Sequence, residues 1–201
     1  MTSRNSEIKK LGLIGGIGPA STVAYYRKII HGVQTQAGNE NLPRLSIESL
    51  NAFKVFSLCR AREFDQLSDY VLGAIHSLAA GGADMVGLTG NTPNIVLDRI
   101  LALSPIPIVS AIDATCNAAK ERGARKVGLR GTVFTMANTF FKTPFEDLGI
   151  PVIVPGEHQI ARIQATRLCR CLREALQHPR REIKDAMNRS DQQQASSVVA
   201  L

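Results

Sequence analysis

Several features that would point to particular functions are scarce or missing in this chain of 201 residues. It contains no tryptophan, and aromatic residues make up only 5% of it, so it lacks the aromatic platforms on which many nucleic-acid-binding domains stack bases. No apolar run is long enough to cross a membrane, and residues 1–10 are polar and charged, without the apolar segment of a signal peptide. We therefore expect a cytoplasmic protein that has neither a membrane nor a specific nucleic acid as partner.

The cysteines and histidines form no pattern that is typical of a metal site. The spacing of the cysteines matches no Cys-x-x-Cys pair, and the last two are too close for an ordinary disulfide: Cys59, Cys116, Cys169 and Cys171. The histidines show neither His-x-x-His nor His-Glu-x-x-His spacing: His31, His76, His158 and His178. We expect reduced thiols and no bound metal.

Basic charge is concentrated near the carboxyl terminus. The net charge is +7, of which residues 161–201 hold +4, from eight basic and four acidic residues. The basic side chains there are not interleaved with aromatic ones. We interpret them as a solvated helix face or as a weak, non-specific attraction for phosphate.

Short apolar runs alternate with segments of helical periodicity along the chain. The strand-like runs are residues 11–14, 45–50, 85–88, 108–111 and 126–129. The helix-like segments begin at residue 21 and cover residues 65–80, 94–103 and 114–122, and a loop is expected around residues 51–53. This alternation predicts an α/β fold with parallel sheets of the doubly wound kind.

One internal similarity indicates two related halves. Residues 9–13 resemble residues 125–129, which lie 116 positions later, although coincidence is an alternative for so short a match. We predict a first α/β domain over residues 1–104 and a second over residues 105–201. The apolar run at residues 197–201 matches the strand at 85–88, so the second half is expected to be truncated after it.

Three loops that follow predicted strands carry the candidate binding residues. The first contains Gly16 and Gly18, but it matches neither the phosphate loop nor the dinucleotide pattern G-x-G-x-x-G, so it indicates a carboxylate site or simply a tight turn. The second is Gly90-Asn91-Thr92, and the third contains Thr132 and Thr135, where an N-cap is the alternative. Amide and hydroxyl groups at strand ends suit a small carboxylate or amino acid.

These loops together resemble the aspartate/glutamate racemase family of isomerases. The similar stretches are "KLGLIGGIGPASTVAYYRKI", "GADMVGLTGNTPN" and "KVGLRGTVFTMANTFFKTPFEDLGIPVIVP", in the family's order. The resemblance implies two pseudo-symmetric doubly wound domains with a ligand cleft between them, a small amino acid or dicarboxylate as ligand, no cofactor, and a possible homodimer. It also implies two cysteines that move the α-proton of the substrate, one on each face.

The departures from the family fall on that catalytic pair. Gly90 stands where the resemblance places the first cysteine, Asn94 replaces a histidine, and the motif of the second cysteine would come only after Leu201. Asn91, Thr92, Thr132 and Thr135 match family positions that bind the substrate. We therefore expect a racemase-like protein with no catalytic residue of its own and impaired or absent activity. The alternative is a non-catalytic dicarboxylate-binding or regulatory protein.

Overall fold

The computed structural model describes residues 9–163. The chain divides after Ala114 into two compact units, and each is described here by itself. The boundary after residue 104 stays a prediction, as does the truncation. The run at 197–201, Cys169, Cys171 and most of the basic carboxyl-terminal residues lie outside the described part. No helix among residues 9–163 is long and apolar enough to span a membrane.

The first unit contains a parallel sheet in the order β2-β1-β3-β4. Its strands are β1 (Leu11–Gly15), β2 (Leu45–Ser49), β3 (Met85–Leu88) and β4 (Ile108–Val109). In the centre β1 pairs with β3, from Leu11 opposite Met85 to Ile14 opposite Leu88. Both strands are largely buried, which explains their near-continuous apolar runs. The predicted α/β class and the parallel pairing are confirmed.

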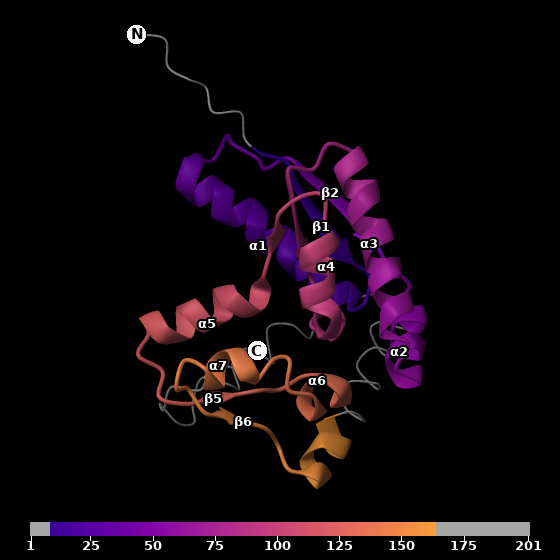
Figure 1. Ribbon diagram of the computed structural model, residues 1–201. Coiled ribbons are helices and arrows are strands. Elements are labelled where there is room, and N and C mark those ends of the chain that lie inside the picture. Colours follow the sequence, from indigo (N-terminus) through magenta and orange to yellow (C-terminus); the bar gives the residue numbers. More distant parts are fainter. Residues whose placement is uncertain (1–8, 164–201) are drawn as a thin grey trace, which may run out of the picture. The chain divides into compact units, whose positions relative to one another are not determined.

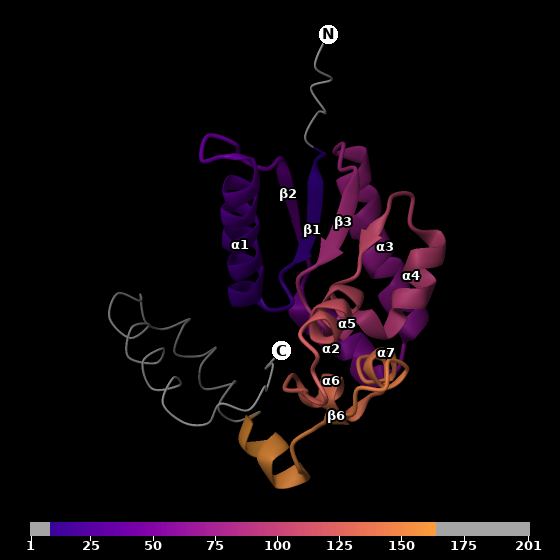
Figure 2. The same cartoon turned by 90° about the vertical axis from the view of Figure 1, so that its left-hand side faces the viewer.

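The order of the strands decides where the helices lie. The helices are α1 (Pro19–Ala37), α2 (Ala52–Ala61), α3 (Phe64–Ala80), the 3-10 helix η1 (Thr92–Val96), α4 (Leu97–Leu103) and α5 (Ala111–Glu121). From β1 the chain moves outward to β2, and from β2 it returns across β1 to β3. Because such crossovers are right-handed, the two moves place their helices on opposite faces of the sheet. Figures 1 and 2 show α1 on one side of the strands and α3 on the other.

Helix α3 supplies much of the buried core of the first unit. Its apolar positions recur with helical spacing, and the side chains that they place inside are Leu67, Val71, Leu72, Ile75 and Leu78. The helix ends at Gly81, followed by Gly82 with φ +79°. The predicted helix over residues 65–80 and its glycine stop are therefore confirmed.

Two local predictions differ from the structure. The expected loop around residues 51–53 is instead the start of α2, whose first turn is capped by Asn51 Oδ1, which accepts from Phe53 N at 2.9 Å. The expected helix from residue 94 is split into η1 and α4. Asn94 Nδ2 donates to the carbonyl oxygens of Gly90 and Asn91, at 3.2 and 3.0 Å, and so holds the tighter first turn.

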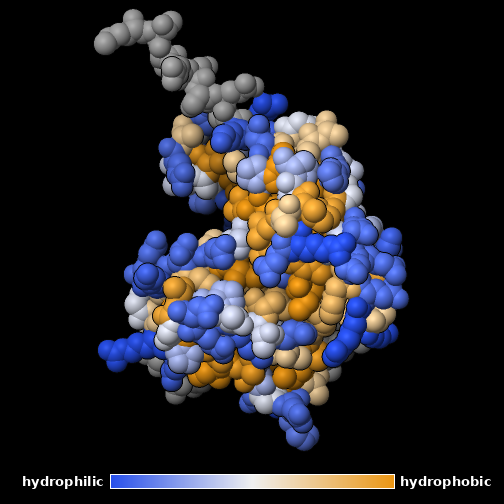
Figure 3. All heavy atoms as spheres, viewed as in Figure 1, coloured by the Kyte–Doolittle hydropathy of each residue, from blue (hydrophilic) through white to orange (hydrophobic). Residues whose placement is uncertain are grey.

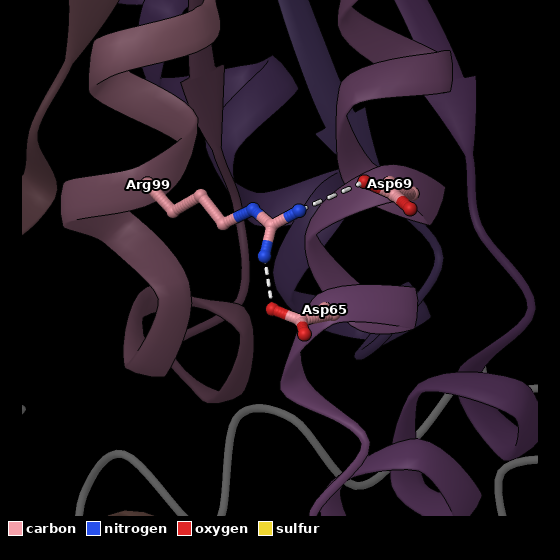
Figure 4. A network of polar contacts seen from close by, with 3 residues as sticks. All are labelled: Asp65, Asp69 and Arg99. Atoms are coloured by element: carbon pink, nitrogen blue, oxygen red, sulfur yellow. Dashed lines mark hydrogen bonds and ion pairs between the residues drawn. The ribbon is translucent and has the colours of Figure 1, made fainter.

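An exposed ion-pair network joins α3 to α4. Figure 4 shows Arg99 of α4 reaching toward two carboxylates one turn apart on α3. It pairs with Asp65 and, at 3.5 Å, with Asp69. All three side chains are exposed, so each pair contributes only about 0.2–1 kcal/mol.

The second unit is built on a short parallel pair, β5 (Val127–Gly128) with β6 (Val152–Ile153). Between these strands lie α6 (Val133–Ala137) and α7 (Thr143–Glu146). Four phenylalanine rings form a chain of contacts with centroids 6.1 to 6.5 Å apart: Phe134, Phe140, Phe141 and Phe145. The strand predicted at residues 126–129 is confirmed in its centre.

The surface of the described residues mixes polar and apolar side chains, as Figure 3 shows. Helix α1 is the clearest case, because its apolar side chains Val23 and Tyr26 are exposed. Among its 19 residues only Thr22 is buried. The apolar positions of this helix therefore do not identify the side chains that pack against the sheet.

Two glycine substitutions test the packing of the first unit. Gly73 lies inside α3, and a Cβ added there would meet nothing within 4 Å. We expect Gly73→Ala to stabilise the protein by about 0.5–1 kcal/mol and to raise Tm by roughly 1–4 °C.

The second substitution is Gly12→Ala in β1. A Cβ at Gly12 would lie 3.0 Å from side-chain atoms of Leu78 and Val86, so this change is expected to lower the stability of the protein by about 1–3 kcal/mol. Thermal unfolding of both variants measures this; a Gly73→Ala protein less stable than wild type would contradict it.

Candidate functional site

The loops after β1 and β3 lie where the connections of the sheet diverge. From β1 the chain leads to β2 on one side, and from β3 it leads to β4 on the other. The carboxyl ends of these adjacent strands form the topological switch point, where open α/β sheets bind their ligands. The β1–α1 loop (residues 16–18) and the β3–η1 loop (residues 89–91) are therefore neighbours, as Thr89 N donating to Ile14 O at 3.0 Å also indicates.

Close packing explains the glycines of the β1–α1 loop. Gly16 has φ +86°, and a Cβ there would lie 2.3 Å from Leu50 O, so a side chain is excluded by conformation and by space. The Gly16 N–H donates to Thr22 Oγ1 at 3.2 Å, and the Gly18 carbonyl accepts from the same hydroxyl at 3.3 Å. Gly16 thus serves the turn directly. Its predicted role toward a carboxylate stays a prediction.

Position 90 can take a Cβ if Ile17 shifts by a few tenths of an ångström. Gly90 does not have the left-handed conformation that requires glycine, and a Cβ there would meet Ile17, with Cβ at 3.3 Å and Cγ2 at 3.5 Å. The first distance is slightly tight and the second is ordinary van der Waals contact. Neither the backbone nor the neighbouring side chain therefore dictates glycine at this strand end.

Backbone donors are available in both loops. Within residues 9–163 the N–H groups of Ile17, Gly18, Gly90 and Asn91 have no hydrogen-bond acceptor. Helix α1 begins directly after Gly18, has no side-chain cap, and carries no acidic residue in its first turn. Free N–H groups beside the amino end of a long helix favour an anion such as a carboxylate.

The predicted hydroxyl contacts are mostly buried. Thr92 is 2% exposed and Thr135 is 1% exposed, whereas Asn91 is half-buried. Thr132 Oγ1 accepts from Thr135 N at 3.1 Å and lies 2.9 Å from Thr135 Oγ1, so it caps α6. The N-cap interpretation of Thr132 is therefore correct. Contact of these threonines with a ligand stays a prediction.

The Thr89 hydroxyl, next to Gly90, is buried and hydrogen-bonded. Its side chain is 3% exposed, and its Oγ1 lies 3.1 Å from Ile14 O and 3.0 Å from Thr22 Oγ1, so its single proton has an acceptor. A hydroxyl that is buried and bonded in this way neither reaches a ligand nor has a base that would activate it. Its contacts join the β3–η1 loop to the first turn of α1 and to β1.

Residues important for the arrangement were not among the sequence candidates. Ser21 Oγ donates to Thr89 O at 2.8 Å, and Thr22 joins both loops through its hydroxyl. Asn94, 4% exposed, holds the carbonyls of the β3–η1 loop. The position of Ser21 and Thr22 shortly after a glycine loop is a sequence signal that could have indicated them. Their common partner, Thr89, lies 67 residues beyond Thr22, so the sequence did not indicate the contact.

Cys59 is not an activated nucleophile. Cys59 and Cys116 are both buried. Burial raises the pKa of the Cys59 thiol to about 11, because this side chain of α2 is shielded from the water that would stabilise the thiolate. No group of three metal-ligating side chains lies within residues 9–163.

A family model and solved structures match this chain. The model described as Asp/Glu/Hydantoin racemase matches residues 14–200. An aspartate racemase homologue from Pyrococcus horikoshii is 32% identical, with a TM-score of 0.69 over 78% of this chain and 69% of its own. A putative Asp/Glu racemase from Yersinia pestis is 30% identical, with a TM-score of 0.71 over 90% of this chain and 78% of its own.

A curated relative is more distant. The broad specificity amino-acid racemase RacX of Bacillus subtilis (strain 168) is 23% identical over 146 residues, which are 71% of this chain. The match spans 63% of the length of RacX.

Alkylation tests the state of Cys59. Because its thiolate is disfavoured and its side chain is buried, we expect iodoacetamide at pH 8 to label Cys59 at least about 100-fold more slowly in the folded protein than in urea. Peptide mass spectrometry follows this one cysteine, and the unfolded chain is its control. Equal labelling rates in both states would contradict the burial.

Proposed function

The chain belongs to the Asp/Glu/hydantoin racemase family, and on that premise we propose that it binds a small amino acid or dicarboxylate without racemising it. The binding site is the carboxyl edge of the first sheet, at the β1–α1 and β3–η1 loops. The proposal is carried by one observation. Gly90, without an acid or base, lies two residues after β3 at the switch point, and the backbone donors of Gly90 and Asn91 have no acceptor within residues 9–163.

Racemisation requires more than binding. A base must remove the α-proton from one face of the substrate and an acid must deliver a proton to the other. The family resemblance places the first of these groups at position 90, where glycine supplies none. Thr89 is buried and bonded, and the amide of Asn91 is neither an acid nor a base at neutral pH.

Carboxylate binding depends on groups that the chain retains. The N–H groups of Gly90 and Asn91 belong to the backbone, so they do not depend on which side chain stands at position 90. Position 90 contributes no negative charge, and the first turn of α1 carries none. Asn91, half-buried at the same edge, adds a side-chain donor and acceptor that suit a zwitterionic amino acid.

A regulatory role is the second form of this proposal. A protein that binds an amino acid without converting it acts through occupancy, and ligand binding then changes stability or association. The cytoplasmic location and the homodimer expected from the sequence stay predictions.

Ligand binding is tested by thermal shift. We expect L- or D-aspartate, glutamate or a related diacid to raise Tm, because binding to the folded state alone stabilises it by about 2.7 kcal/mol at 100 times Kd. Asn91→Ala is expected to reduce the shift. Asn41→Ala is the matched control, because Asn41 follows α1 at the opposite end of the sheet and donates to Ala37 O. No shift with any of these acids, in a folded protein, would contradict the proposal.

Loss of proton transfer is tested by exchange of the α-proton in D₂O. We expect wild type to exchange L- and D-aspartate and glutamate no faster than a sample without protein. Gly90→Cys is expected to fold, since the space beside Ile17 accepts a side chain, and to exchange faster than Gly90→Ser, since a thiol is by far the stronger acid. Exchange by wild type well above the blank, and abolished by Asn91→Ala, would show that the site is catalytic.

A further inference from the structure

The structure assigns a positioning role to a pair of buried threonine hydroxyls. We propose that Thr22 and Thr89, here called the hydroxyl latch, hold the β1–α1 and β3–η1 loops together and so present the free backbone donors to the ligand. The relevance of the latch to binding rests on the proposed site at this edge. The mechanical role of the latch is independent of any ligand.

The geometry of the latch links elements that are distant in sequence. Thr22 Oγ1, in the first turn of α1, lies 3.0 Å from Thr89 Oγ1, which follows β3. The Thr22 hydroxyl also accepts from Gly16 N and donates to Gly18 O. One side chain therefore holds both ends of the β1–α1 loop and touches the first residue of the other loop.

The surroundings of Thr22 are shaped to admit it. A Cβ at Gly15 would lie 2.5 Å from Thr22 Cγ2, so the absence of a side chain there makes room for the threonine. Because Thr22 Oγ1 gives its single proton to Gly18 O, Thr89 Oγ1 is the donor in the bond to Thr22 Oγ1, and Ile14 O, 3.1 Å from Thr89 Oγ1, accepts instead from Thr89 N. Ser21 Oγ donates to Thr89 O at 2.8 Å. Both latch residues are thus fully engaged in hydrogen bonds.

Helix α1 buries far fewer side chains than α3 does. Thr22 is the only buried residue among the 19 of α1, whereas α3 buries seven. Apolar packing is not directional, but hydrogen bonds between hydroxyls fix distance and angle. The latch therefore sets where the amino end of α1 lies relative to the Gly90 and Asn91 N–H groups.

Valine substitutions separate the hydroxyl from the shape. Valine matches threonine in shape but has no hydroxyl, so Thr89→Val removes the bond to Thr22, and Thr22→Val removes that bond together with those to Gly16 N and Gly18 O. The variants are Thr22→Val, Thr89→Val and the double variant, with Thr89→Ser as the conservative change. Thr35→Val is the matched control, because Thr35 lies near the far end of α1 and donates only to His31 O.

Hydrogen exchange of the full-length protein without ligand is the first measurement. Each valine variant is expected to increase exchange roughly 5- to 10-fold in both segments, residues 15–22 and residues 89–94, and the double variant by less than the product of the two single effects, since the bond between the hydroxyls is lost in all three. Thr89→Ser is expected to stay within about 2-fold of wild type, and Thr35→Val to leave both segments unchanged. An effect confined to the substituted segment, or an equal effect of Thr89→Ser, would overturn the latch.

Affinity for L-aspartate and L-glutamate is the second measurement. If wild type binds one of them, Thr89→Val is expected to weaken that binding about 10-fold or more, while Thr89→Ser retains it. Equal affinity of Thr89→Val and wild type would overturn the positioning role. If wild type binds none of the acids tested, the proposed function fails, and the exchange measurement alone then decides on the latch.

Discussion

The parallel pairing of β1 with β3 is the constraint on which the rest of this site depends. The register from Leu11 opposite Met85 to Ile14 opposite Leu88 brings the two strand ends level, and the bond from Thr89 N to Ile14 O extends that register by one step. Because β1 and β3 then lead away to opposite sides of the sheet, their loops separate just beyond this point. Every donor that we assign to ligand binding in the first unit lies within a few residues of it.

Binding and proton transfer make different demands on these loops. A carboxylate can be bound by backbone N–H groups, which the fold positions whatever the side chains are. Transfer of an α-proton needs a group of suitable pKa at one particular position. The proposed function rests on this difference: the backbone donors remain in the loops, whereas Gly90 supplies no acid or base at its position. The two glycines differ in the same way. The turn requires Gly16, because its φ is +86° and a Cβ there would clash, whereas the backbone conformation at position 90 does not require glycine.

Much of the fold was predictable because its signals are local. The apolar runs of β1 and β3, the helical periodicity of α3 and its stop at Gly81 each depend on residues near one another in the chain. The start of α2 was not predicted because asparagine is favoured both in turns and at helix N-caps, so Asn51 alone does not distinguish them. The split between η1 and α4 was missed because it depends on the side chain of Asn94 reaching back to the preceding loop.

By itself the sequence determined the α/β alternation, the resemblance to a racemase family and the absence of an acid or base at position 90. These are properties of residue type and spacing, which survive without coordinates. Only the tertiary structure decided that Thr22 meets Thr89, that Thr92 and Thr135 are buried, and that position 90 has space beside Ile17. In the first unit such facts depend on the pairing of β1 with β3, segments some 70 residues apart, and the sequence does not distinguish a buried hydroxyl from an exposed one.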